Sequence, residues 1–173
     1  LRTLGVAGAG VDISTAAIDA AARADRGHAW IVANADRELP LADAQFDAVL
    51  SITSRRNAAE FSRLLAPGGV AVVVVPGADD LVELREAVLG RGDRRERVDS
   101  VAVEMAPRFT LASRRTIRDE AQLVPDALRD LLASTYRGAR TREHSRASGL
   151  SAMTVTIHRD LCVFSVADER GSS

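Results

Sequence analysis

Hydrophobic runs alternate with helix-like patterns along this chain, and that alternation is typical of an open, mostly parallel α/β sheet. The segments expected to form strands are 6–13, 28–35, 46–52 and 70–75, and those expected to form helices between them are 14–24 and 57–65. Ser14 or Thr15 is expected to cap the first helix, and Pro67-Gly68-Gly69 to end the second. The valine run that follows suits a strand buried on both faces.

The second half of the chain has less regular patterns. Asp79 and Asp80 take the positions of an N-cap and a first-turn acid before a helical pattern. A polar loop is expected at 90–97, a strand at 109–120, a helix at 125–134, two strands at 154–157 and 161–166, and a disordered tail at 168–173. We interpret the last two strands as a hairpin around His158-Arg159-Asp160 at the sheet edge.

The composition is that of a soluble globular protein, with 46% hydrophobic and 27% charged residues. The sequence contains no apolar run long enough to span a bilayer and no secretory signal, so a cytoplasmic location is expected. Cys162 is the single cysteine, which excludes an internal disulfide and a four-cysteine zinc site within this chain, and no metal is expected. The net charge of −1 does not by itself indicate a nucleic-acid-binding protein.

Two acidic residues follow consecutive expected strands. Asp12 can accept hydrogen bonds from both ribose hydroxyls of a nucleotide, or it can stabilise the N-terminus of the helix that follows. Asp36 can accept a hydrogen bond from an adenine amino group, with the Ala35 N–H facing a ring nitrogen, or it can be a turn aspartate. Because both would face the crevice at the carboxyl edge of the sheet, the pair favours a nucleotide site.

The order of the motifs resembles class I S-adenosylmethionine-dependent methyltransferases. After Asp36, Leu39-Pro40 and Phe46-Asp47 come in the usual order, and Pro67-Gly68-Gly69 precedes the valine strand. The resemblance implies an α/β fold with a Rossmann-like, mostly parallel sheet, an antiparallel C-terminal edge strand and a missing N-terminal part. It implies S-adenosylmethionine as the cofactor, bound at Asp12, Ile13, Ala35, Asp36 and Ile52.

A closer resemblance is to the guanine-N1 methyltransferases of 23S ribosomal RNA, a family that includes enzymes giving macrolide producers self-resistance. It covers residues 5–120 and rests on GVDIS, ITSRRNAAEFSRLLAPGG and VPGADDLVELRE. It implies RNA binding and a guanine base as methyl acceptor. Family members begin with a four-cysteine zinc module and a glycine-rich first turn, and this chain has neither. Their Met-Thr-Pro-Phe-like stretch is replaced at 133–138.

The resemblance implies acceptor-binding residues after the third strand, at Ser54, Arg55, Arg56 and Asn57. Asn57 can hydrogen-bond a base edge or cap the next helix, and capping is favoured. Arg56 can pair with a phosphate or a carboxylate, or be solvated. No residue is assigned a catalytic role, because methyl transfer from a sulfonium needs mainly in-line placement of the nucleophile and removal of one proton.

Two arginine-rich stretches are candidates for RNA contact, and both also fit solvated faces. The first is 91–97, and the second runs from Tyr136 and Arg137 to Arg146. An aromatic ring among cations suits unstacked bases and phosphates, so Tyr136 and Arg137 are assigned to substrate binding. Structural roles are expected for His28 and His158, and a core position for Trp30.

Other functions stay open beside an RNA methyltransferase. They are a small-molecule methyltransferase, a nicotinamide-dependent oxidoreductase, and a non-catalytic remnant if the natural chain begins at Leu1. We expect one partial domain at 1–166, with a cofactor-binding core at 1–90, acceptor-side elements at 91–166 and a tail at 167–173. The oligomeric state is not determined by the sequence, and a homodimer is left open.

Overall fold

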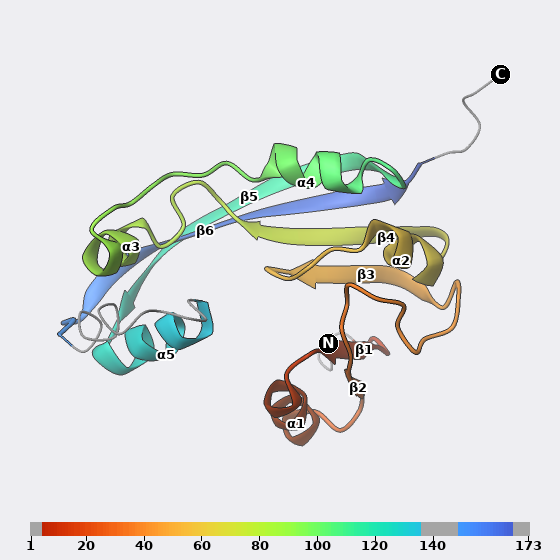
Figure 1. The fold of residues 1–173 in the computed structure, drawn as a ribbon, viewed down its shortest axis with the longest axis horizontal. Helices are drawn as coiled ribbons and strands as arrows, with labels where there is room; N and C mark the ends of the chain where they lie inside the picture. Colours follow the sequence, from red (N-terminus) through yellow and green to blue (C-terminus); the bar gives the residue numbers. More distant parts are fainter. Residues whose placement is uncertain (1–4, 136–148, 168–173) are drawn as a thin grey trace.

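The computed structural model describes residues 5–135 and 149–167 of the chain. The elements, in chain order, are β1 (Ala9–Asp12), α1 (Thr15–Ala24), β2 (Ala29–Val32), β3 (Phe46–Ile52), α2 (Ala58–Leu64), β4 (Leu65–Pro76), α3 (Val82–Leu89), α4 (Val98–Met105), β5 (Phe109–Leu123), α5 (Pro125–Thr135) and β6 (Met153–Val166). The strands form a parallel pair, β1–β2, and a four-stranded sheet of order β3-β4-β6-β5 (Figure 1). The expected mixed α/β fold is confirmed.

Strands β1 and β2 form the small sheet, and helix α1 connects them along the chain. Ser14 caps α1, as expected, because its side chain accepts a hydrogen bond from the N–H of Ala17 at 3.3 Å. Trp30 lies across Gly10, where an added Cβ would come within 2.2 Å of the indole ring. The indole therefore packs on the small sheet rather than in the main core, and the glycine leaves room for it.

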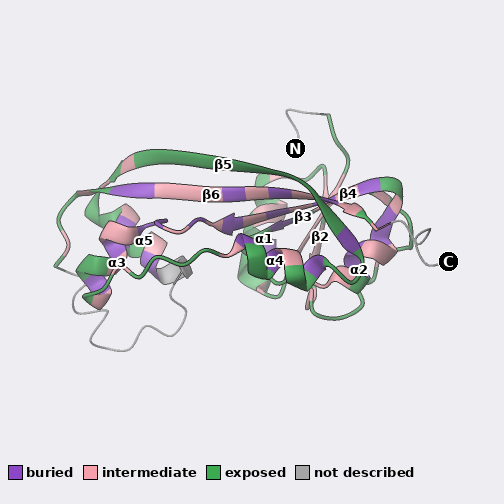
Figure 2. Cartoon of the chain, turned by 90° about the horizontal axis from the view of Figure 1, so that it is seen from above, coloured by how far each residue is buried: buried purple, intermediate pink, exposed green. Residues whose placement is uncertain are grey.

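The large sheet is parallel between β3 and β4 and antiparallel from β4 through β6 to β5. The edge strand β5 is exposed along most of its length, whereas β6 is largely covered (Figure 2). The expected hairpin at 158–160 is wrong, because β6 runs unbroken through these residues. Asp160 pairs with Val75 of β4 on one side and Thr116 of β5 on the other.

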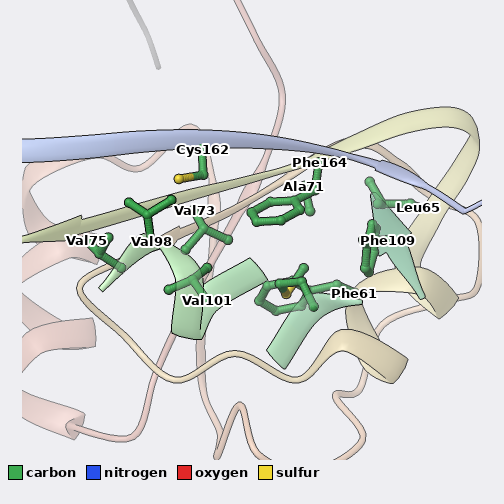
Figure 3. Close-up of a cluster of buried hydrophobic side chains, with 11 residues drawn as sticks. Phe61, Leu65, Ala71, Val73, Val75, Val98, Val101, Phe109, Cys162 and Phe164 are labelled. Carbon is green, nitrogen blue, oxygen red and sulfur yellow. The ribbon is translucent and has the colours of Figure 1, made fainter. Parts of the chain in front are cut away.

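Two groups of buried side chains form the core. The larger group packs α2 and α4 against one face of the sheet (Figure 3), and its members are Phe61, Leu65, Ala71, Val73, Val75, Val98, Val101, Met105, Phe109, Cys162 and Phe164. The smaller group joins α3 and α5 to the other end of β6, and its members are Leu81, Leu84, Val88, Leu128, Leu132 and Val155. Helix α4 contributes three of the larger group's side chains, although the sequence interpretation contained no helix there.

Two expected element boundaries are wrong. Helix α2 ends at Leu64, before Pro67-Gly68-Gly69, and β4 already begins at Leu65; Gly68 then has φ 81°, a conformation that favours glycine. Asp79 and Asp80 do not cap α3, since the residue before that helix is Leu81 and no side-chain cap bond is made. Both carboxylates are instead buried in ion pairs. No helix in the described ranges is long and apolar enough to cross a bilayer.

Candidate functional site

Asp12 lies at the carboxyl end of β1, next to Val32 at the end of β2. Its Oδ1 accepts a hydrogen bond from the N–H of Ser14 at 2.7 Å, so the carboxylate supports the start of α1 as one interpretation expected. Within the described residues no hydrogen bond reaches Oδ2, which leaves this oxygen able to accept one from a ligand. Ile13 follows with 60% of its surface exposed, an apolar side chain beside the carboxylate.

Asp36 lies in the loop after β2, as expected for an acid at the next strand end. Its N–H donates to Oδ1 of Asn34 at 2.9 Å, which makes a tight local turn after Ala35. Its exposed carboxylate is 3.9 Å from Nε of Arg55, which is itself 81% exposed. A pair this long and this exposed contributes little, so a ligand can displace Arg55 at small cost.

Asn57 connects the small sheet to the large one. Its Oδ1 accepts a hydrogen bond from the N–H of Glu60 at 3.2 Å, which confirms the expected helix cap. Its Nδ2 donates to the backbone carbonyl of Asp36 at 3.3 Å. The loop after β2 and the segment after β3 are therefore joined at one edge, although β1–β2 and β3 share no strand pairing in the described chain.

A buried ion pair between Glu60 and Arg63 holds this loop against α2. Oε1 of Glu60 accepts a hydrogen bond from the N–H of Leu39 at 2.8 Å, and Arg63 donates to the carbonyls of Leu39 at 3.1 Å and Leu41 at 2.8 Å. The Arg63 guanidinium lowers the pKa of Glu60, and the Leu39 N–H adds to the effect against the opposing influence of burial. The sequence interpretation missed this pair, whose signal is the i, i+3 spacing of opposite charges.

The Glu60→Gln variant is expected to be less stable at neutral pH and to lose part of its acid sensitivity. Because the folded-state pKa of Glu60 is lowered, its contribution is present above the ordinary carboxyl pKa and is lost as pH falls through the folded value. We expect a loss of about 1–3 kcal/mol at pH 7 that shrinks below about pH 4. Urea unfolding at pH 7 and below about pH 4 measures the free energy of unfolding of both proteins. An equal loss of stability at the two pH values would contradict the prediction.

The end of β3 forms a strained turn. Thr53 has φ 50°, which is uncommon for a β-branched residue, and its N–H donates to the carbonyl of Val74 at 2.9 Å. Ile52 before it is 60% exposed, and Ser54 and Arg55 after it are exposed. Arg56 pairs with Glu104 of α4 at 2.6 Å. Of the interpretations open for this arginine, the structure shows the carboxylate pair.

A cavity of about 520 Å³ opens beside this turn and is named here the acceptor pocket. Its lining residues are Thr53, Ser54, Arg56, Val75, Pro76, Asp80, Leu81, Arg97, Leu131 and Arg159. Asp80 is 6% exposed, pairs with Arg159, and accepts a hydrogen bond from the N–H of His158 at 3.0 Å. Sequence reasoning missed Asp80 and Arg159 as site residues, whereas Arg97 lies in the 91–97 stretch that it gave as a candidate for RNA contact. Tyr136 and Arg137, which it assigned to substrate binding, lie outside the described residues.

A network of charged side chains lies next to Asp80 and Arg159, two of the residues that line the acceptor pocket. Asp79 contacts Nδ1 of His158 and pairs with Arg118 at 2.6 Å. The hydrogen bond with His158, together with the Arg118 cation, lowers the pKa of Asp79 against the effect of burial. Asp160, fully buried, accepts from Arg114 at 3.0 Å and Thr116 at 2.8 Å. The expected structural role of His158 is confirmed, as is that of His28, which bonds Asp25 and the Val6 carbonyl.

The comparison with protein families agrees with this fold. Residues 1–73 match a family model described as a methyltransferase domain. That segment holds β1, β2, β3 and the start of β4, and so all the strand ends that carry the expected cofactor residues. The chain has the fold of a class I methyltransferase.

We compare the chain with two of its curated relatives, both of which are named as 23S rRNA methyltransferases. One is the Bacillus subtilis (strain 168) protein named "Putative 23S rRNA (guanine-N(1)-)-methyltransferase YxjB", 44% identical over 103 residues, or 60% of this chain and 35% of that protein. The other is the Streptomyces fradiae 23S rRNA (guanine(748)-N(1))-methyltransferase, 33% identical over 71% of this chain and 44% of that protein. The chain thus spans less than half the length of each relative.

Solved methyltransferase structures share the fold at low identity. A SAM-dependent methyltransferase from Thermotoga maritima is 16% identical, with a TM-score of 0.53 over 94% of this chain and 74% of that one. A protein from Bacillus halodurans C-125 described as a putative methyltransferase is 12% identical, with a TM-score of 0.56 over 92% of this chain and 82% of that one. These similarities concern the fold alone.

The strand ends fit the nucleoside part of S-adenosylmethionine. Asp12 has an oxygen able to accept from a ribose hydroxyl, and the exposed carboxylate of Asp36 can accept from an amino group. Ile13 and Ile52, each 60% exposed, offer apolar surface that a purine ring would cover. Among the described residues, no group of three or more His, Cys, Asp or Glu side chains is arranged to hold a metal ion.

Proposed function

We propose that this chain is part of an S-adenosylmethionine-dependent methyltransferase that modifies a guanine base of ribosomal RNA. The observation that carries the proposal is the joining of three strand ends at one edge, where Asn57 links the Asp36 loop to the segment after β3. The names of the curated relatives from Bacillus subtilis and Streptomyces fradiae support guanine in 23S rRNA as the acceptor. The cofactor supplies an electrophilic methyl group on a sulfonium.

The cofactor end of the site would work by binding and orientation. Asp12 would accept hydrogen bonds from the ribose hydroxyls through the oxygen that Ser14 does not use, and Asp36 would accept one from the adenine amino group. Ile13 and Ile52 would lie against the adenine faces and exclude water from them. Fixing the nucleoside in this way fixes the direction in which the methyl group points.

The acceptor end would be the acceptor pocket, whose volume lies within the roughly 300–1,000 Å³ of small-molecule sites. Val75, Pro76 and Leu81 form apolar walls for a base removed from its stack. The Asp80 carboxylate suits the N1–H and amino donors of guanine, and Arg97 suits its O6 acceptor. Asp80 would take up the N1 proton as the N1–methyl bond forms and the sulfur–methyl bond of the donor breaks, which leaves S-adenosylhomocysteine.

Transfer of labelled methyl groups from S-adenosylmethionine tests the proposal. The protein is incubated separately with total ribosomal RNA and with a panel of small nucleophiles, and the RNA is digested and analysed for 1-methylguanosine. We expect label in 1-methylguanosine with the natural protein and at least about a hundredfold less with Asp80→Asn. Asp99→Asn, an exposed acid on α4, is the matched control and should keep full activity. Label in small acceptors but not in RNA would contradict the proposal.

A further inference from the structure

A second cavity, of about 290 Å³, adjoins the acceptor pocket and is named here the arginine pocket. It is lined by Pro76, Asp80, Leu81, Arg85, Leu89, Arg91, Asp93, Arg95 and Arg97. Four of these residues, Pro76, Asp80, Leu81 and Arg97, also line the acceptor pocket, so the two cavities share a wall. Four arginines therefore surround a hollow directly beside the place proposed for the base.

The positive charge in this pocket is not balanced by its carboxylates. Asp80 is paired with Arg159, and Asp93 lies 3.7 Å from Arg91. In the part of the chain that the structure describes, Arg85, Arg95 and Arg97 make no ion pair within 4.0 Å. Three guanidinium groups thus line one cavity without an ion pair of this length among the described residues, and their mutual repulsion has a cost that a bound anion would reduce.

Burial makes this excess of positive charge more costly. Nε of Arg85 is buried without a hydrogen-bond partner among the described residues, and a buried donor left unpaired costs free energy. The pKa of Arg97 is lowered by burial and by repulsion from Arg85 and Arg95, against the opposing attraction of Asp80 and Glu96. A solvated charged surface would show neither feature, because water would satisfy the donor and screen the repulsion. Both features favour the binding of an anion between these arginines.

We propose that the arginine pocket binds a phosphate group of the nucleotide whose base enters the acceptor pocket. This inference rests on the proposed function. Guanidinium groups bind phosphate oxygens through paired, charge-assisted hydrogen bonds, and Arg85, Arg95 and Arg97 supply such donors from α3 and from the loop at 91–97. Because Arg97 belongs to both cavities, it would contact the base on one side and its phosphate on the other. Recognition would then extend over one whole nucleotide.

Binding of nucleoside and nucleotide probes tests the inference without any methyl transfer. Calorimetric titrations compare guanosine, guanosine 5′-monophosphate, guanosine 3′-monophosphate and inorganic phosphate. At least one guanosine monophosphate is expected to bind at least about tenfold more tightly than guanosine and than phosphate alone. This advantage is expected to disappear in Arg95→Gln, whose side chain is exposed on a loop and can change without disturbing the core.

Arg94→Gln is the matched control, because Arg94 has the same charge on the same loop but does not line the pocket. It should keep the monophosphate advantage to within twofold. Equal losses in the two variants, or equal binding of guanosine and both monophosphates, would overturn the inference. Inorganic phosphate binding as tightly as the monophosphates would also overturn it, because it would indicate a site for free anions.

The salt dependence of RNA binding gives a second readout. Losing one phosphate contact should reduce the slope of log affinity against log salt by about 0.7–0.9 in Arg95→Gln and leave it unchanged in Arg94→Gln. An unchanged slope in both variants, with normal RNA methylation, would overturn the arginine pocket and leave the proposed function standing. A monophosphate advantage that depends on Arg95, with no RNA methylation, would instead contradict the proposed function.

Discussion

Replacing Asp12 with alanine is expected to weaken S-adenosylmethionine binding by at least about tenfold, and replacing Asp36 with alanine by a similar factor. Each carboxylate would lose a charge-assisted hydrogen bond to the nucleoside, and such bonds contribute about 1.5–3 kcal/mol. Isothermal titration of the purified variants measures the effect. Asp19→Asn, an exposed acid on α1, should bind as the natural protein does.

A further variant separates the two roles open for Asp12. Asp12→Asn keeps an oxygen for the Ser14 N–H but removes the negative charge. If Asp12 binds the ribose, Asp12→Asn weakens cofactor binding and leaves thermal stability nearly unchanged. If Asp12 only supports the start of α1, Asp12→Ala lowers stability, and binding of the folded protein is unchanged in both variants. The second pattern would contradict the assignment of Asp12.

Replacing Asp160 with alanine is expected to lower the free energy of unfolding by about 2–4 kcal/mol, less than the full cost of breaking a buried ion pair. Asp160 is fully buried in β6, and its Oδ1 accepts from Nε of Arg114 and from the Thr116 hydroxyl. Its loss would remove the acceptor of the Thr116 hydroxyl on the exposed strand β5, and both this hydroxyl and the guanidinium of Arg114, 40% exposed, would be partly rehydrated. That rehydration is why the expected loss is moderate.

Urea unfolding of Asp160→Ala and Asp119→Ala measures this prediction. Asp119 lies on the neighbouring strand β5, where it is exposed, so its replacement should change stability by less than about 0.5 kcal/mol. Asp160→Asn keeps an acceptor oxygen for Thr116, so its free energy of unfolding should lie between those of Asp160→Ala and Asp119→Ala. Equal stability of Asp160→Ala and Asp119→Ala would show that the buried carboxylate does not hold β6 in the sheet.

The sequence predicted correctly those elements that depend on interactions between residues close together in the chain. Strand β3 was expected at its observed limits, and α1 was expected from its Ser14 cap, because alternation and capping depend on residues a few positions apart. The interruption expected at 158–160 is wrong for the opposite reason. The partner that makes a buried Asp160 acceptable is Arg114, which is 46 positions away in the sequence. Helix α4 was missed because it has only eight residues and directly follows a polar loop.

The residues of the candidate site also fall into two groups, those that the sequence could predict and those that it could not. Asp12 and Asp36 could be found from the sequence, because the carboxyl ends of parallel strands lie at one edge whatever the details of packing. Asp80 and Arg159 could not, because they meet only when β6 pairs with β4. Arg56 was left open between phosphate and carboxylate, and Glu104, which decides it, lies on the helix that the sequence interpretation did not contain.

Methyl NMR of the isoleucine side chains tests the central claim most directly, because it needs no substitution. Ile13 and Ile52 lie at the strand ends proposed to bind adenosine, whereas Ile18 is buried in α1 and Ile117 is exposed on β5. We expect S-adenosylhomocysteine to shift the Ile13 and Ile52 signals, to leave the Ile117 signal unchanged, and to bind far more tightly than NAD. Shifts confined to other methyl groups, or an equal response to NAD, would contradict the assignment of this edge as the methyl-donor site.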